Sequence, residues 1–199
     1  MSNKKGFEVA VGTIVLIILA VLVFIFAIAI VFKIFGGAEE IKSQIDIKTK
    51  SQIEAAMQRT NELVSIPFNV RQTKVGDVVN FGMGVKNIGD PEDFSASICF
   101  DAAYYPDGKE NAAVDPDSIM DSWLGNFRTI PAFSLGKNEY KLIPITVLAN
   151  ADTGLGPTQK GDYVFNVCIF RKDVPDDCAS ASLSEVYTGR KYQVVARVV

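Results

Sequence analysis

The segment 78-VVNFGMGVKNIGDPEDFSASICF-100 contains two runs in which apolar residues alternate with small or polar ones. Apolar side chains occupy every second position of the first run, namely Val79, Phe81, Met83 and Val85, and the pattern returns over residues 94–100. A turn cluster, Asn87–Pro91, separates the two runs. Because successive side chains of a strand point to opposite faces, each run predicts a strand with one buried face in an antiparallel sheet.

The same alternation extends over the rest of the C-terminal part. Residues 163–169 repeat it after a turn at 160–162, and further strand candidates are 67–73, 127–133, 139–148 and 191–198. Pro144 places its strand at a sheet edge or a bulge, because proline cannot donate a hydrogen bond to a neighbouring strand. Six or seven short strands separated by turn signals predict that residues 66–199 form an all-β immunoglobulin-like antiparallel sandwich.

The N-terminal part has a different character, because residues 9–32 (VAVGTIVLIILAVLVFIFAIAIVF) contain no charged side chain. As a helix they would extend about 36 Å, which is enough to cross a hydrocarbon layer of about 30 Å. The segment is too long for a cleaved secretory signal, so we expect a transmembrane or filament-core helix over 9–35. Lys4 and Lys5 predict that residues 1–8 are a cytoplasmic tail or leader and that the C-terminal domain is extracytoplasmic.

Residues 36–65 connect this helix to the β domain. Apolar residues, among them Ile41, Ile45, Ile53 and Met57, recur there at roughly helical spacing among polar ones, which predicts an amphipathic stalk helix. Pro67 marks its end, since the residue before a proline avoids helical geometry. The apolar stripe needs a partner surface, which is its own domain, a neighbouring copy or the membrane face.

The residues before the apolar helix carry a resemblance: Lys4, Lys5, Gly6, Phe7 and Glu8. This pattern resembles the processing site of the type IV pilin and archaellin superfamily. The resemblance implies a cut after Gly6, a filament core made of the apolar helices, and Glu8 near the new amino terminus of a neighbour. Glu8 departs from the pilin pattern, in which the acid is the fifth residue after the cut. The alternative is an uncleaved signal anchor.

The strands carry a second resemblance, in VGDVVNF at 75–81, VKNIG at 85–89 and GDYVFNV at 161–167. These sequence segments resemble those of CARDB-like and adhesion sandwich domains of archaeal and bacterial cell surfaces. The plan of the whole chain also resembles a group of uncharacterised single-span archaeal envelope proteins. These likenesses imply an outer domain of immunoglobulin type and supply no activity.

Composition excludes many enzyme classes. The 199-residue chain has no histidine, which removes the commonest general base and metal ligand. We find no phosphate-binding glycine loop, zinc spacing, activated nucleophile or acid/base pair, and we expect no enzymatic activity, cofactor or small-molecule substrate. The first 37 residues are net basic and the rest is mildly acidic, so no basic surface indicates nucleic acid.

Three cysteines leave two disulfide pairings open. If residues 168–178 fold as a hairpin, Cys168 and Cys178 face each other and can form a disulfide, as an extracytoplasmic location allows; the alternative is two reduced, partly exposed thiols. Cys99 shares the outward phase of its strand with Cys168, so a Cys99–Cys168 bridge is the competing connectivity.

An acidic loop at 101–121 offers weak metal candidates. Asp115, Asp117 and Asp121 could bind calcium through carboxylate oxygens, although the loop lacks the glycine and the closing glutamate of an EF-hand; the alternative is a solvated acidic loop. Nearby, three aromatic residues would form either a recognition patch or part of the core: Tyr104, Tyr105 and Trp123.

The resulting hypothesis is a membrane-anchored, extracytoplasmic structural or interaction protein. In one version it is a pilin-like or archaellin-like filament subunit that self-associates through the apolar helix and reaches the cell surface. In another, an uncleaved single-pass anchor carries a domain that binds an envelope or surface partner. A third hypothesis, from a different class, is a calcium-dependent binding module or ectoenzyme that uses the 101–121 loop.

Overall fold

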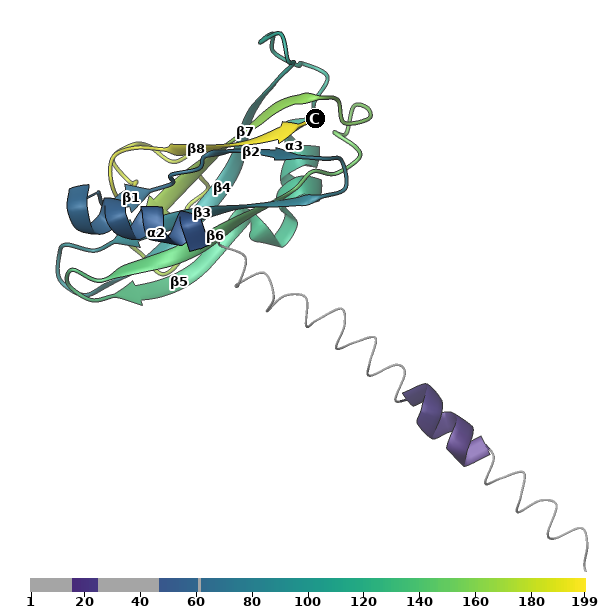
Figure 1. Cartoon of the computed structure of the whole chain (residues 1–199), viewed down its shortest axis with the longest axis horizontal. Helices are drawn as coiled ribbons and strands as arrows, with labels where there is room; N and C mark the ends of the chain where they lie inside the picture. The colour runs from purple at the N-terminus through teal and green to yellow at the C-terminus, as the bar shows by residue number, and fades with distance from the viewer. Residues whose placement is uncertain (1–15, 25–46, 61) are drawn as a thin grey trace, which may run out of the picture. The chain divides into compact units, whose positions relative to one another are not determined.

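A computed structural model describes residues 16–24, 47–60 and 62–199 (Figure 1). The chain divides into two compact units, Met1–Gln44 and Ile45–Val199. In the first unit, residues 16–24 form a helix. The second unit contains the described strands and the hydrophobic core.

The second unit begins with helical residues and continues as strands with one short helical insertion. Its elements in chain order are helix α2 (Ile47–Ala55), the π-helical turn η2 (Ala56–Thr60), β1 (Val64–Ser65), β2 (Val70–Thr73), β3 (Val78–Lys86), β4 (Glu92–Tyr104), helix α3 (Pro116–Ile119), the π-helical turn η3 (Met120–Leu124), the 3-10 helix η4 (Gly125–Arg128), β5 (Thr129–Leu135), β6 (Tyr140–Leu148), β7 (Gly161–Phe170) and β8 (Tyr192–Val198).

The strands form two sheets around one core. The three-stranded sheet is antiparallel, with the order β1-β3-β6. The five-stranded sheet has the order β2-β8-β7-β4-β5; its β2–β8 pair is parallel and its other pairs are antiparallel. Phe81 and Met83 of β3 are fully buried, as are Phe94 and Phe165 of the larger sheet. The burial of these large side chains drives the association of the two sheets.

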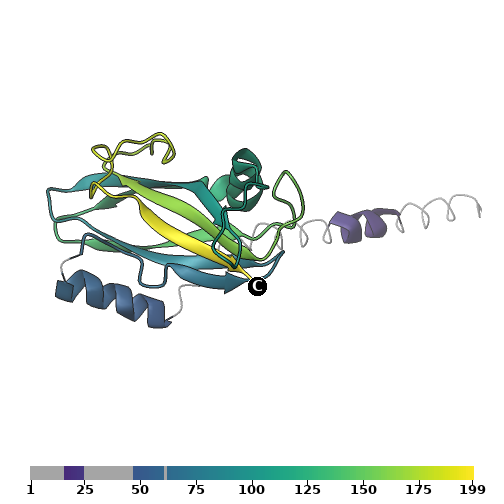
Figure 2. The same cartoon turned by 90° about the horizontal axis from the view of Figure 1, so that it is seen from above.

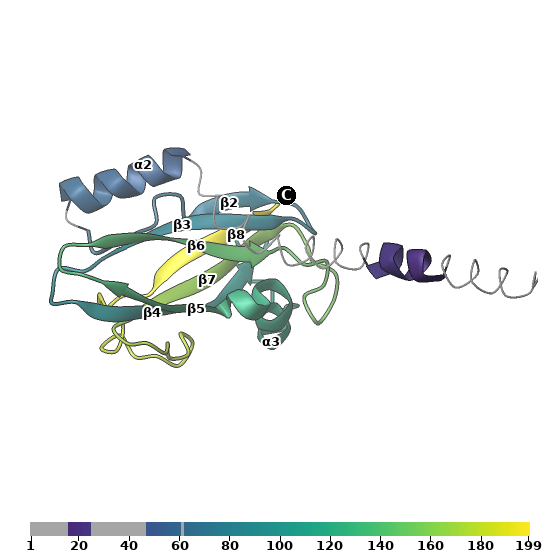
Figure 3. The same ribbon diagram turned by 90° about the horizontal axis from the view of Figure 1, so that it is seen from below.

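Two further segments lie on opposite sides of the sheets, as Figures 2 and 3 show. Helix α2 lies on the side of β3 and β6, and the loop between β7 and β8, residues 171–190, lies on the other side. Ile53 of α2 and Met57 of η2 are fully buried. At Gly84 of β3, a Cβ atom would clash with Ile53 and lie 2.9 Å from the Met57 Cε atom, so this glycine allows the helix to approach the strand closely.

The helix of the predicted 36–65 stalk therefore rests on its own domain where it is described. The compact unit begins at Ile45, upstream of the predicted domain start at residue 66. β1, at the end of the predicted stalk, pairs with β3.

The prediction of an all-β immunoglobulin-like antiparallel sandwich is wrong. The larger sheet is mixed, because β2 and β8 are parallel, and the helical insertion from α3 to η4 separates β4 from β5. Alternation identifies strands that bury one face, but it specifies neither the partner nor the direction of a strand. Strands β2 to β8 do overlap the predicted segments, and Pro144 lies in β6, an edge strand of the smaller sheet.

The prediction of a transmembrane helix over 9–35 is also contradicted, together with the signal anchor and the single-pass membrane or cell-surface location that depended on it. Across the described ranges, no helix combines the length and the apolar content that a membrane crossing requires. Within the apolar run, residues 16–24 are described, and they form a helix. The remainder of the 9–35 range and the candidate processing residues Lys4, Lys5, Gly6, Phe7 and Glu8 lie outside the described residues.

Candidate functional site

The outer face of the five-stranded sheet has two contrasting ends. Ser97 of β4 pairs with Cys168 of β7 near one end, and Asp162 of β7 pairs with Arg197 of β8 near the other. Because side chains alternate along a strand, Cys168, Val164 and Asp162 share one face of β7. The 171–190 loop covers the Cys168 end, whereas the Asp162 end is open.

The 171–190 loop is attached to the sheet at several points. Cys168 and Cys178 form a disulfide across a sequence separation of 10, which is one of the two pairings that the sequence leaves open. The Ser97 hydroxyl donates to the Asp176 carbonyl oxygen at 2.6 Å, and the Lys191 ammonium donates to the Cys178 carbonyl oxygen at 2.7 Å. These bonds attach the first half of the loop to β4, β7 and the start of β8.

Tyr187 attaches the second half of the loop. Its backbone N–H donates to the Ile169 carbonyl oxygen at 2.7 Å, and its hydroxyl donates to the Lys86 carbonyl oxygen at 2.8 Å. The Arg171 guanidinium lies 4.6 Å from the centre of its ring, a favourable cation–π distance. Tyr187 thus connects the loop to both sheets.

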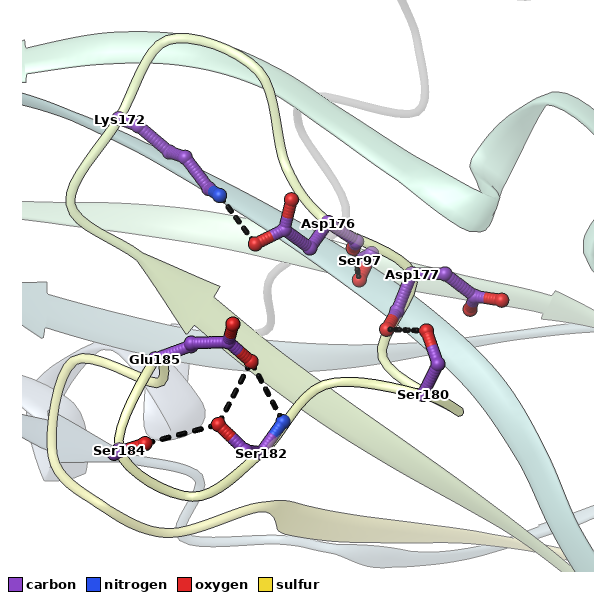
Figure 4. A network of polar contacts seen from close by, with 8 residues as sticks. All are labelled: Ser97, Lys172, Asp176, Asp177, Ser180, Ser182, Ser184 and Glu185. Atoms are coloured by element: carbon purple, nitrogen blue, oxygen red, sulfur yellow. Dashed lines mark hydrogen bonds and ion pairs between the residues drawn. The ribbon is translucent and has the colours of Figure 1, made fainter.

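Internal hydrogen bonds hold the shape of the loop, as Figure 4 shows. Lys172 and Asp176 form an ion pair. Glu185 Oε2 accepts from the Ser182 hydroxyl and backbone N–H, both at 2.8 Å, and the hydroxyl bond is the main reason that the pKa of Glu185 is lowered. Such local side chain to backbone bonds order loops that have no regular structure.

The loop nevertheless presents apolar side chains to solvent. Val174 is 66% exposed and Leu183 is 57% exposed. Asp173, beside Val174, is exposed as well. These side chains are accessible to a partner on a loop that internal bonds keep ordered.

Beneath the loop lies a small buried layer that contains polar groups. Cys99 is a free, buried thiol, and burial raises its pKa to about 11. Ser95 is fully buried, and its hydroxyl has no hydrogen-bond partner among the described groups. Outward-facing serines are usually solvated in a sheet, so the 171–190 loop acts as a cover over a face that would otherwise be open.

The open end of the same sheet face forms a groove of about 650 Å³, which we call the tyrosine groove. Its lining includes Tyr104, Tyr105, Pro106, Lys160, Gly161, Asp162, Val164, Val195, Arg197 and Val198. β7 begins at Gly161, where a Cβ atom would clash with the Tyr104 carbonyl oxygen. The absence of a side chain there lets the tyrosine wall lie close to the sheet. The volume is within the range of protein binding sites.

The charges of the groove are of two kinds. Arg197 donates from Nε and Nη2 to the two Asp162 carboxylate oxygens, at 2.6 and 2.8 Å, and these bonds lower the pKa of Asp162. Lys160 is exposed, and no carboxylate in the described ranges lies within ion-pair distance of it. The groove therefore offers one cation that has no counter-ion among the described residues.

Two of the three calcium candidates, Asp115 and Asp121, interact with neighbouring side chains of their own domain. Asp115 caps α3, where its Oδ2 accepts from the Ser118 N–H at 3.2 Å and from the Ser118 hydroxyl at 2.6 Å; the hydroxyl bond lowers its pKa. Asp121 pairs with Arg128 at 3.5 Å, and Asp117 lies exposed in the first turn of α3. In the part of the chain that the structure describes, no three His, Cys, Asp or Glu residues are placed to hold a metal ion.

The three aromatic candidates separate. Trp123 is 1% exposed, its ring centre lies 4.4 Å from that of Tyr163, and its Nε1–H donates to the Asp152 carbonyl oxygen at 3.3 Å. It belongs to the core. Tyr104 and Tyr105 line the tyrosine groove, so they alone remain available for recognition.

The described helix of the first unit is apolar on all sides. Its large side chains are 48–67% exposed: Leu16, Ile17, Ile18, Leu19, Val21, Leu22, Val23 and Phe24. A helix that is hydrophobic all round is normally buried. Water is therefore an unfavourable environment for this segment, and association that covers it would be favourable.

Comparison with known proteins shows no family. No family model matches the chain, and no curated protein matches it. Solved structures match weakly. The alkylpurine DNA glycosylase AlkC of Pseudomonas fluorescens, bound to DNA containing an abasic site analog, has a TM-score of 0.37 at 14% identity, over 68% of this chain and 30% of that one.

Two further solved structures are similarly distant. A family 123 glycoside hydrolase from Clostridium perfringens has a TM-score of 0.36 at 8% identity, over 66% of this chain and 23% of that one. WR4, a C. elegans MSP family member, has a TM-score of 0.30 at 4% identity, over 69% and 97%. The chain thus spans less than a third of the two enzymes, and none of the three supports the pilin, archaellin or CARDB resemblances.

Proposed function

We propose that this chain is a non-enzymatic assembly and interaction protein. In the proposal, copies associate through the apolar helix, as subunits of pilin-like or archaellin-like filaments do, and each copy displays its β domain for recognition. The observation that carries the proposal is the exposure of the uniformly apolar residues 16–24. A bundle of such helices removes apolar surface from water, at about 25 cal/mol for each Å² that is buried.

The chemistry of the described domain favours a structural role over catalysis. The lowered pKa values of Asp115, Asp162 and Glu185 each arise mainly from a hydrogen bond that organises a helix cap, a strand pair or a loop. A catalytic carboxyl group more often has a pKa that burial or a like charge has raised. These groups therefore act in the fold.

The test is the size of the full-length protein in buffer without detergent. We expect sedimentation velocity to show assemblies of many copies. Leu19→Asp combined with Leu22→Asp should shift the protein to monomers, because unpaired carboxylates in an apolar bundle are strongly unfavourable.

The matched control carries the same two charges outside the helix, in Ile88→Asp combined with Leu155→Asp, since both residues are exposed apolar side chains of the β domain. The control should assemble as the wild type does. A wild type that is monomeric, or a Leu19/Leu22 variant that assembles as well as the wild type, would refute the proposal. The cut after Gly6 stays a separate prediction. An intact mass equal to that of a chain beginning at Phe7 would establish it.

A further inference from the structure

The 171–190 loop and the tyrosine groove lie at opposite ends of the same sheet face. Figure 2 shows the loop, in yellow-green, at one end of the sheet and the C-terminal end of β8 at the other. β7 connects the two surfaces, from Gly161 beside the groove to Phe170 beside the loop. The disulfide ties the loop to β7 at Cys168, six residues, or about 20 Å of strand, from Asp162 at the groove.

The two surfaces are complementary in their apolar groups. The loop projects Val174 and Leu183 into solvent, whereas the groove has a floor that includes Val164 and Val195 and a wall that includes Tyr104. A protruding aliphatic side chain that fills a pocket with an aromatic wall is a common arrangement at the centre of protein interfaces.

They are complementary in charge as well. Lys160 at the groove has no ion-pair partner in the described ranges, and the same holds for Asp173 beside Val174. The two charges are opposite and both are exposed. Opposite charges at the rim of an interface set its register and orientation.

We propose that the tyrosine groove of one copy receives the Val174 end of the 171–190 loop of a second copy, with Lys160 facing Asp173. The two surfaces differ but share one sheet face, so the contact is either doubled in a two-fold pair of copies or repeated head-to-tail along a row. In a row, the domain at one end keeps a free groove and the domain at the other end keeps a free loop. This inference rests on the proposed self-association and adds the contact between β domains that would order the assembly.

Carbodiimide coupling of the assembled full-length protein tests the contact, because this reagent joins an amine to a carboxylate only where the two already touch. We expect mass spectrometry to identify a peptide in which Lys160 is linked to Asp173. Mixing isotopically light and heavy protein should give mixed-isotope pairs, which shows that the link joins two copies. A link that is absent, or that forms only within one copy, would overturn the inference.

Substitutions in the loop sharpen the test. Val174→Ser should lower the yield of the link by about tenfold, which corresponds to about 1.4 kcal/mol, whereas Leu155→Ser, at an equally exposed aliphatic position, should leave the yield unchanged. Lys160→Asp combined with Asp173→Lys should form the reversed link. Equal yields in the Val174 and Leu155 variants would contradict the groove as the binding site.

The proposed function and the proposed groove contact can be refuted separately. If sedimentation shows assemblies but no Lys160–Asp173 link forms, the groove contact is wrong and the helix-mediated association stands. If the full-length protein is monomeric, the proposed function is wrong, whatever link forms between domains at high concentration.

Discussion

Removing the Cys168–Cys178 disulfide should both destabilise the β domain and uncover Cys99. The perturbation is the double substitution Cys168→Ser with Cys178→Ser. For a sequence separation of 10, the chain-entropy relation gives a stabilisation of about 2.7 kcal/mol at 25 °C. With a urea dependence of roughly 1.5–2.5 kcal/mol per molar, the midpoint of unfolding should fall by about 1–2 M.

Trp123 provides the assay in the full-length protein. It is the one tryptophan of the chain, and it is buried against Tyr163 in the core of the second unit. Its fluorescence therefore reports the unfolding of that unit, without interference from residues 16–24. The oxidised wild type and the double variant are compared in urea at the same protein concentration.

A thiol reagent gives the second readout, since Cys99 is the free cysteine in the oxidised protein. Burial under the loop holds the pKa of Cys99 at about 11, so at pH 8 little thiolate exists and little of it is accessible. Without the disulfide, the cover opens more often, the pKa of an uncovered Cys99 falls toward its ordinary value near 8.5, and the rate of labelling should rise at least about tenfold.

The two readouts refute different steps. An unchanged urea midpoint would show that the disulfide does not constrain the unfolded chain as calculated. A lower urea midpoint with an unchanged rate of Cys99 labelling in native buffer would show that Ser97, Lys191 and Tyr187 alone keep the 171–190 loop in place. The disulfide would then not be needed to keep Cys99 covered.

Three more substitutions test local parts of the account. Gly84→Val should displace α2 and destabilise the domain by about 1–3 kcal/mol, visible as faster hydrogen exchange in residues 47–60; unchanged exchange would show that the helix does not depend on this close approach. Asp162→Asn should make the free energy of unfolding less sensitive to acid, because it removes the ion pair with Arg197. The pKa of Asp162 is lowered in the folded protein. The contribution of the pair to the free energy of unfolding is therefore complete above the unfolded pKa near 3.9 and is lost as the pH falls through the folded pKa. Urea midpoints measured from pH 5 to pH 2 that fall equally in the wild type and the variant would contradict this role of Asp162. Asp115→Ala should lower the urea midpoint by removing the cap of α3, whereas Asp115→Asn should retain most of it, and equal midpoints for the two variants would argue against a capping role.

The strands were the most predictable part of the fold. The alternation at 79–85 and 94–100 corresponds to β3 and β4, because burial of one face imposes a period of two. The parallel β2–β8 pair was not predictable, since it joins segments far apart in the chain and depends on how the rest of the sheet closes. The helical insertion was missed although Asp115 and Pro116 give its signal, a capping residue followed by proline in the first turn.

The candidate surfaces were less predictable than the strands. The sequence leaves the Cys168–Cys178 and Cys99–Cys168 pairings both open. It singles out Tyr104 and Tyr105, but it assigns Trp123 to the same group. The register of β4, β7 and β8 decides which of these residues share a face, and no local pattern contains that register. The groove and the 171–190 loop arise from it.

The central claim is that the apolar helices of different copies contact one another. A photoreactive amino acid at Leu19 of the full-length protein, activated in buffer without detergent, tests this claim most directly. We expect crosslinked peptides that join position 19 to residues 16–24 of another copy, with mixed-isotope pairs when light and heavy protein are combined. Crosslinks confined to a single copy, or none to residues 16–24, would contradict it.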